Sequence, residues 1–245
     1  GFSIPFFTAA ILALLTLPVA VRRLPESLAA KTHETPEEKA KIGWREIERR
    51  LRPLLALAFI GQFGLALFEA IFALYAGAKF DYGPVEVGAI FIVCGLVMAI
   101  FQTVMVGFFA GRVGEIYQIA AGFILMGGSL AMITAAQTTP AVFALVGVMA
   151  LGMALIAPNL SSLVSKGMDG SNTGTAIGAQ NAANSLGQFG GPVLGGALFA
   201  ESVGMPFLFA GIALLATGLV VARKILFSPV SAAFGGIGQT GEEKN

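Results

Sequence analysis

Long apolar stretches separated by short polar ones dominate this chain. Seven stretches are long enough to cross a bilayer as helices, at residues 2–21, 53–78, 85–110, 116–137, 140–165, 172–200 and 205–222. Outside the connection 24–52, charged residues lie mostly at or near the ends of these stretches, as expected when charge is excluded from hydrocarbon. The pattern predicts an all-α, polytopic membrane helical bundle with seven transmembrane helices.

Composition narrows the class further. Of 245 residues, 56% are apolar and 12% are charged, whereas about a quarter of a soluble domain is charged. Fifteen charged residues lie between Arg22 and Arg52, so too few remain to cover a water-facing surface elsewhere. This excludes a soluble enzyme and a nucleic-acid-binding protein, and it makes the lipid bilayer the expected partner.

Motifs for chemistry are missing from the sequence. A single histidine, His33, and a single cysteine, Cys94, leave neither a His/Cys metal cluster nor an internal disulfide. Zinc-protease, serine-hydrolase, Walker and CxxC motifs are also absent. We therefore predict that the protein is not an enzyme and has no cofactor or metal.

The basic residues predict which side of the membrane each connection faces. Alternating spans place 14 Lys and Arg residues on one side and only Lys79 on the other. Because basic residues accumulate in cytoplasmic loops, we expect the first residues outside and the C-terminal tail in the cytoplasm.

The connection 24–52 is the only long one. Within it, Thr35–Glu38 has capping-box spacing with proline at the first helical position, which indicates a helix start. Apolar residues from Ile42 to Leu51 then form one face, while charged residues occupy the rest. We expect a helix on the cytoplasmic membrane surface that leads into the second span. A solvated charged linker is the alternative.

An internal repeat relates the first apolar stretch to the last. Residues 5–24 align without gaps on residues 206–225, with 8 of 20 positions identical, including a Pro-Phe entry and an Arg exit. One repeat unit would then contain six helices. On this basis we expect the chain to be the last seven helices of a twelve-helix protein whose first half lies before residue 1.

Six plus six helices joined by a charged loop resemble the major facilitator superfamily. The pattern G-x8-G-x3-G-P-x2-G-G, matched at every fixed position, resembles the antiporter motif of the drug:proton antiporters. Its residues are Gly178, Gly187, Gly191, Pro192, Gly195 and Gly196. The family has this motif in the fifth helix, whereas here it lies in the repeat-related eleventh.

A second stretch, from Gly107 to Glu115, resembles the family's loop motif G-x-x-x-D-[RK]-x-G-[RK]. It matches at Gly107, Arg112 and Gly114. Gly111 replaces the acidic residue of the motif, and Glu115 replaces its last basic residue. The gating charges of this loop therefore differ from the family pattern.

The resemblance implies a secondary transporter that expels small hydrophobic or amphipathic compounds in exchange for protons, by alternating access. It also implies a domain organisation, with 1–23 as the last helix of the first half, 24–52 as the inter-half loop, 53–226 as the second half and 227–245 as a cytoplasmic tail. We expect a monomer in the bacterial inner membrane. A sugar or metabolite importer and, less favoured, a seven-helix receptor are the alternatives.

Polar groups inside the spans are the candidates for a transport cavity, because amides in hydrocarbon need partners. The candidate amides are Gln62, Gln102, Asn159 and a stripe on the 172–200 span formed by Asn181, Asn184 and Gln188. Hydrogen bonding between helices without substrate is the alternative for each of them.

Glu69 is the only acidic or basic residue well inside a span. A carboxyl group that is neutral when buried and ionised when the cavity opens to water would provide proton coupling. A carboxylate that attracts a cationic substrate and a permanently protonated Glu69 bonded to a neighbouring helix are the alternatives.

Glycine recurs every four residues at Gly187, Gly191 and Gly195, which removes side chains from one helix face. Such a face allows a neighbouring backbone to approach closely, and Pro192 bends the helix beside it. This arrangement suits a surface between two rocking halves. Tight packing in a static bundle is the alternative.

Overall fold

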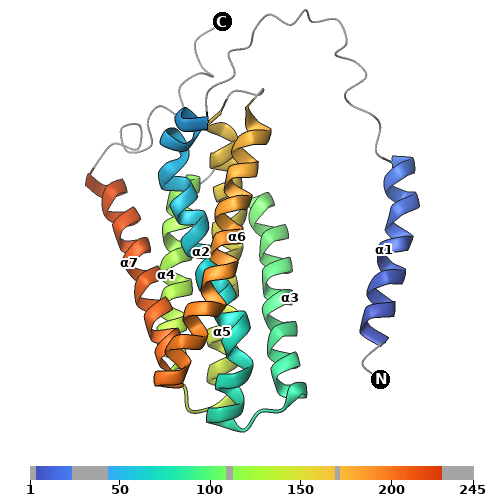
Figure 1. Cartoon of the computed structure of the whole chain (residues 1–245), viewed down its shortest axis with the longest axis vertical. Coiled ribbons are helices and arrows are strands. Elements are labelled where there is room, and N and C mark those ends of the chain that lie inside the picture. Colours follow the sequence, from blue (N-terminus) through green and yellow to red (C-terminus); the bar gives the residue numbers. More distant parts are fainter. Residues whose placement is uncertain (1–3, 24–43, 109–112, 169–171, 228–245) are drawn as a thin grey trace, which may run out of the picture. The chain divides into compact units, whose positions relative to one another are not determined.

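Residues 4–23, 44–108, 113–168 and 172–227 are described by a computed structural model (Figure 1). They form α1 (Ile4–Arg23), α2 (Trp44–Phe80), α3 (Pro84–Phe108), α4 (Glu115–Ile133), α5 (Thr139–Lys166), α6 (Thr173–Glu201) and α7 (Met205–Phe227). The chain divides into two compact units, residues 1–40 with α1 and residues 41–245 with the other six helices. The described residues contain helices and no strand, which confirms the all-α fold.

Five of the described helices are long and apolar enough to cross a membrane, namely α2, α3, α4, α5 and α7. The helix α6 coincides with the predicted span at 172–200, but its amides and glycines keep it outside this set. The helix α1 has 20 residues, and a shorter apolar stretch, Phe6–Thr16, is found within it. Polar residues are tolerated in a membrane helix that faces protein or water, so low hydropathy is compatible with a span in α6.

The helix α2 contains 37 residues and includes residues 44–52, the last part of the charged connection. Residues from Trp44 to Arg52 continue into the apolar stretch, and Pro53 lies inside the helix without ending it. The boundary expected between residues 52 and 53 therefore falls within one continuous helix. Extending a helix avoids the cost of a new nucleus, which favours this continuity. The predicted helix start at Thr35–Glu38 lies outside the described residues.

A left-handed residue and three hydrogen bonds shape the turn between α2 and α3. Asp81 has a φ of 56°, in the left-handed region. The amides of Asp81 and Tyr82 donate to carbonyl groups in the last turn of α2 at 3.1 and 3.3 Å, a pattern that ends helices. The Glu86 carboxylate accepts the Gly83 amide at 2.9 Å and caps the start of α3.

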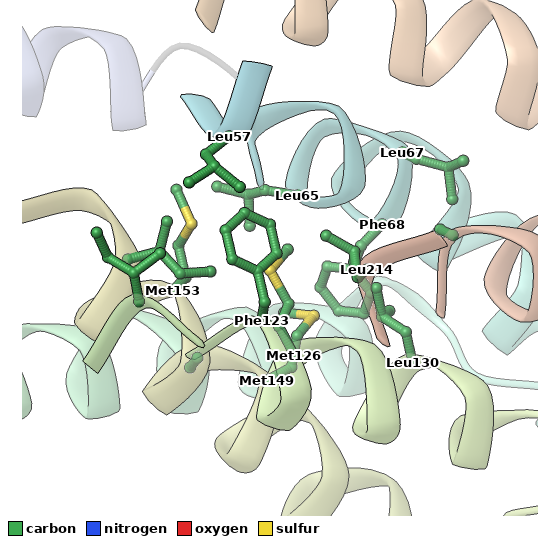
Figure 2. Close-up of a cluster of buried hydrophobic side chains, with 14 of the residues drawn as sticks. Leu57, Leu65, Leu67, Phe68, Phe123, Met126, Leu130, Met149, Met153 and Leu214 are labelled. Carbon is green, nitrogen blue, oxygen red and sulfur yellow. The ribbon is translucent and has the colours of Figure 1, made fainter. Parts of the chain in front are cut away.

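The core of the six-helix unit is built around α4, which packs against α5 and α7 (Figure 2). Buried side chains fill the space between these helices and α2; they include Leu57, Phe68, Phe123, Met126, Leu130, Met149, Met153 and Leu214. Burial of such large apolar side chains determines which face of each helix points inward.

Glycines bring α4 close to its neighbours. A methyl group placed on Gly122 would lie 2.7 Å from the carbonyl oxygen of Gly152 in α5, and one on Gly152 would lie 2.6 Å from that of Gly122. A methyl group on Gly127 would lie 2.5 Å from the Leu215 backbone nitrogen in α7. These backbones touch directly, as in membrane helix pairs with small residues at the contact.

Candidate functional site

The glycine face of α6 packs against α2. A methyl group on Gly187 would lie 2.5 Å from the carbonyl oxygen of Phe59, and one on Gly191 would lie 2.6 Å from that of Phe63. One on Gly195 would lie 2.8 Å from a side chain further along α2. The contacts advance along both helices together, so α2 and α6 run parallel.

In the described residues, α2 of the same six-helix unit covers this face, as the alternative of tight packing within the bundle predicts. Spacing alone could not identify the neighbour, because any backbone fits a surface without side chains. Gly178 and Gly196 behave differently, since a methyl group on either would meet no other atom of the described residues within 4 Å. Pro192 lies inside α6, which continues past it to Glu201.

Gln62 and Gln188 lie on the same side of the α2–α6 contact. Gln62 comes one position before Phe63, and Gln188 comes one position after Gly187. Two parallel helices face each other, so the residue before a contact on one helix and the residue after a contact on the other lie on the same side of the pair. Gln62 is half-buried and Gln188 is exposed in the described unit.

The other two amides of the α6 stripe remain accessible as well. Asn181 is exposed and Asn184 is half-buried. Packing within the six-helix unit therefore leaves the amide stripe at least partly accessible.

Glu69 is exposed on α2, seven residues after Gln62 and hence on the same face. The residue before it, Phe68, contacts Phe91 of α3, with ring centres 6.0 Å apart. The α2 face that carries Gln62 and Glu69 thus lies between α6 and α3. Gln102 is half-buried further along α3.

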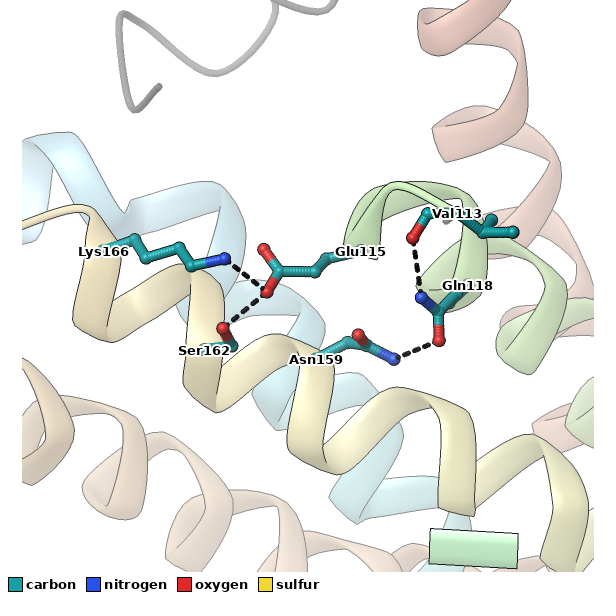
Figure 3. Close-up of polar contacts among 6 residues, drawn as sticks. All are labelled: Val113, Glu115, Gln118, Asn159, Ser162 and Lys166. Atoms are coloured by element: carbon teal, nitrogen blue, oxygen red, sulfur yellow. Dashed lines mark hydrogen bonds and ion pairs between the residues drawn. The ribbon is translucent and has the colours of Figure 1, made fainter. Parts of the chain in front are cut away.

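Asn159 lies apart from this face, in the contact between α4 and α5 (Figure 3). Its amide nitrogen donates to the Gln118 side-chain oxygen at 3.1 Å and to the Leu155 carbonyl oxygen at 2.7 Å. The Gln118 amide nitrogen in turn donates to the Val113 carbonyl oxygen at 2.8 Å. These contacts favour hydrogen bonding between helices for Asn159.

An ion pair joins the same two helices one turn away (Figure 3). The Lys166 ammonium group donates to the Glu115 carboxylate at 2.8 Å, and the Ser162 hydroxyl donates to the same carboxylate oxygen. Glu115 is the first residue of α4 and Lys166 is the last residue of α5. Each charge also complements the dipole of its own helix.

A family comparison decides the classification. The sequence model of the Major Facilitator Superfamily matches residues 1–192 and 54–234. The chain belongs to the Major Facilitator Superfamily. This membership confirms the predicted resemblance and rejects the seven-helix receptor.

Individual superfamily members are similar along most of the chain. Multidrug resistance protein 1 of Bacillus subtilis strain 168 is 31% identical over 227 residues, which cover 90% of this chain and 57% of that protein. Multidrug resistance protein 2 of the same strain is 29% identical over 88% of this chain and 55% of its own length. Quinolone resistance protein NorA of Staphylococcus aureus strain COL is 25% identical over 90% of this chain and 57% of its length. The chain thus spans little more than half the length of these relatives.

The superfamily loop motif brackets the α3–α4 connection. Gly107 lies in the last turn of α3, Gly114 precedes the first residue of α4, and Arg112 lies outside the described residues. A methyl group on Gly114 would lie 3.1 Å from the ring of Tyr117, which is an exposed side chain.

Sequence reasoning missed the polar contacts between helices in this unit. Buried Gln180 donates to the Ser161 hydroxyl at 3.0 Å and connects α6 with α5. The sequence analysis placed Glu115 in the loop motif and Lys166 among the charges at span ends, but it did not pair them. The sequence could have predicted this ion pair, because an acidic residue begins α4 and a basic residue ends α5.

Proposed function

We propose that this chain is part of a proton-coupled exporter of small hydrophobic or amphipathic compounds. The observation that carries the proposal is similarity along 88–90% of the chain to proteins named for multidrug or quinolone resistance. Those names favour export over import of a sugar or other metabolite. Because the chain spans only 55–57% of these relatives, the functional unit would include further helices, in keeping with the proposed organisation into two halves.

The proposed substrate surface is the α2 face between α6 and α3. Gln62 and Gln188 point to one side of the α2–α6 contact and would offer hydrogen bonds to a bound compound. Asn181 and Asn184 would extend this polar surface along α6, and Gln102 would contribute from α3. Asn159 is the weakest candidate because its amide nitrogen is already hydrogen-bonded within the unit.

Glu69 is the proposed proton-coupling group. It lies on the same α2 face as Gln62, about 10 Å further along the helix at 1.5 Å per residue. An accessible carboxyl group within a span would exchange protons when that face meets water and would be neutralised when the face closes. This alternation would couple proton entry to substrate exit.

The glycine face and the loop motif have proposed mechanical roles. Gly187, Gly191 and Gly195 would let α6 slide along α2 as the cavity opens and closes. Gly107, Arg112 and Gly114 would shape the cytoplasmic turn between α3 and α4. Gly178 and Gly196, which have open space around them, would admit helices outside the described unit.

The proposed setting is the bacterial inner membrane, with the protein a monomer and its C-terminus cytoplasmic. Residues 24–52 and 227–245 would then face the cytoplasm, and the turn after α6 would face the exterior. A cysteine introduced at Ser202 should react with an impermeant maleimide added outside. Labelling only after the membrane is permeabilised would reverse this orientation.

A transport assay on the complete protein tests the proposed function. Purified protein in proteoliposomes should move a fluorescent lipophilic dye when a pH gradient is imposed, and collapse of the gradient by an ionophore should stop the movement. Dye movement that is equal with and without the gradient would reject proton coupling. A lack of movement for a panel of lipophilic compounds would reject the export proposal.

A further inference from the structure

The last turn of α2 contains an ammonium group bound to the end of another helix. The Lys79 ammonium donates to the Thr134 carbonyl oxygen at 2.5 Å and to the Tyr75 hydroxyl at 3.0 Å. The Tyr75 hydroxyl donates to the Ile133 carbonyl oxygen at 2.8 Å. Ile133 is the last residue of α4 and Thr134 is its C-cap. Two carbonyl groups at the end of α4 are thus satisfied by side chains from α2.

Aromatic rings complete the surroundings of this ammonium group. The Lys79 nitrogen lies 5.4 Å from the centre of the Tyr75 ring and 5.3 Å from that of Phe80. Both distances fall within the range of a cation–π interaction. Tyr75 is 1% exposed, and its ring centre lies 4.7 Å from that of Phe207 in α7. The ring that carries the hydroxyl is therefore fixed by the core.

The chain directly after Lys79 is also held in place. Asp81 turns the backbone at the end of α2. Tyr82 stacks on Phe80 with ring centres 5.2 Å apart, and its hydroxyl hydrogen-bonds the Thr139 hydroxyl at 2.7 Å. Because Thr139 begins α5, the end of α2 is connected to both α4 and α5.

In the predicted topology, Lys79 is the only basic residue on the exterior side, where such residues are disfavoured. Its location is explained by the partial negative charge at the carboxyl end of α4, which favours a cation there. We propose that Lys79 is a positioning residue whose ammonium group caps α4 and so keeps α2, which carries Gln62 and Glu69, aligned with α4 during transport. The role of this alignment in transport rests on the proposed function, whereas the capping contact does not.

The distance along α2 supports such a role. Glu69 lies ten residues before Lys79, or about 15 Å along the same helix. Between them the helix is continuous, so a fixed end restricts how far the Glu69 face can rotate or slide.

Two variants of the complete protein separate the capping contact from a general need for a long side chain. Lys79→Met keeps the stem and removes the ammonium group, whereas Lys79→Arg keeps charge and hydrogen-bond donors. Lys224→Met, near the end of α7, is the control for loss of one positive charge. Hydrogen exchange of the Ala135 and Ala136 amides reports on the end of α4, because both donate to carbonyl groups in its last turn.

Amide exchange at Ala135 and Ala136 should be roughly tenfold faster in Lys79→Met, since a hydrogen bond to a charged group is lost. Lys79→Arg and Lys224→Met should exchange like the unmodified protein. In a Lys79→Ala protein, added ethylammonium should restore slow exchange, whereas tetramethylammonium, which has no N–H donor, should not. In proteoliposomes, Lys79→Met should lower the maximal dye-transport rate and leave KM unchanged.

Unchanged exchange in Lys79→Met would overturn the capping contact, and so would equal effects of the two ammonium ions on Lys79→Ala. Faster exchange together with a normal transport rate would overturn the positioning role. If the unmodified protein moves no dye, the proposed function and the positioning role fail, while amide exchange still decides the capping contact.

Discussion

The helices α3 and α4 are both strongly apolar, yet they are used in opposite ways. Within the described unit, 61% of the most apolar stretch of α4 is buried, whereas only 11% of the most apolar stretch of α3 is buried. Gly122 and Gly127 of α4 allow backbones of α5 and α7 to touch it, whereas a methyl group on Gly88 or Gly95 of α3 would meet no described atom within 4 Å. Hydropathy therefore identifies a span, and the surroundings of its glycines identify what the span packs against.

The same contrast exists within α6, where Gly191 is in backbone contact with α2 and Gly196 faces open space. Gly191→Leu should abolish transport by forcing α2 and α6 apart, while insertion into the membrane persists. Gly196→Leu adds the same side chain and should leave the α2–α6 contact intact. Membrane fractionation and dye transport would measure both. Full activity of Gly191→Leu would contradict the close approach of these helices.

The open α2 face can be tested through its carboxyl group. Glu69→Gln preserves shape and hydrogen bonding but cannot titrate, so it should eliminate dye transport driven by a pH gradient. Glu201→Gln, at the end of α6, removes a carboxylate outside the span and should retain that transport. Rates measured in proteoliposomes at several gradients would separate the two variants. An unchanged gradient response in Glu69→Gln would make Glu69 a structural residue.

Two smaller substitutions compare the closely packed α4–α5 contact with the open helix α3. Gly152→Ala places a methyl group 2.6 Å from the Gly122 carbonyl oxygen, so α4 and α5 must separate. The free energy of unfolding should fall by about 1–3 kcal/mol, as for other overpacked sites. Gly95→Ala on α3 should show no such loss. Unfolding of both proteins in detergent would measure the difference, and equal losses would remove the distinction between the two helices.

Helix positions were largely predictable from the sequence, but helix contacts were not. The spans predicted at 140–165 and 172–200 match α5 and α6 closely, because apolar length is a local property. The sequence identified the glycines at 187, 191 and 195 as a site of close helix contact, but it did not identify α2 as the neighbour. Likewise, the bond between Asn159 and Gln118 joins residues 41 positions apart, and no local pattern connects them.

The smallest expected effect concerns the ion pair at the start of α4. Lys166 is 59% exposed and Glu115 is 22% exposed, so water screens much of their attraction. Glu115→Gln retains a side-chain oxygen that can accept from Ser162 while removing the charge. The free energy of unfolding should therefore fall by only about 0.5 kcal/mol, typical of an accessible pair. High salt should reduce this difference further in unfolding measurements, because ions screen exposed charges. A loss as large as that of Gly152→Ala would show that the charge stabilises the α4–α5 contact as much as the close backbone approach does.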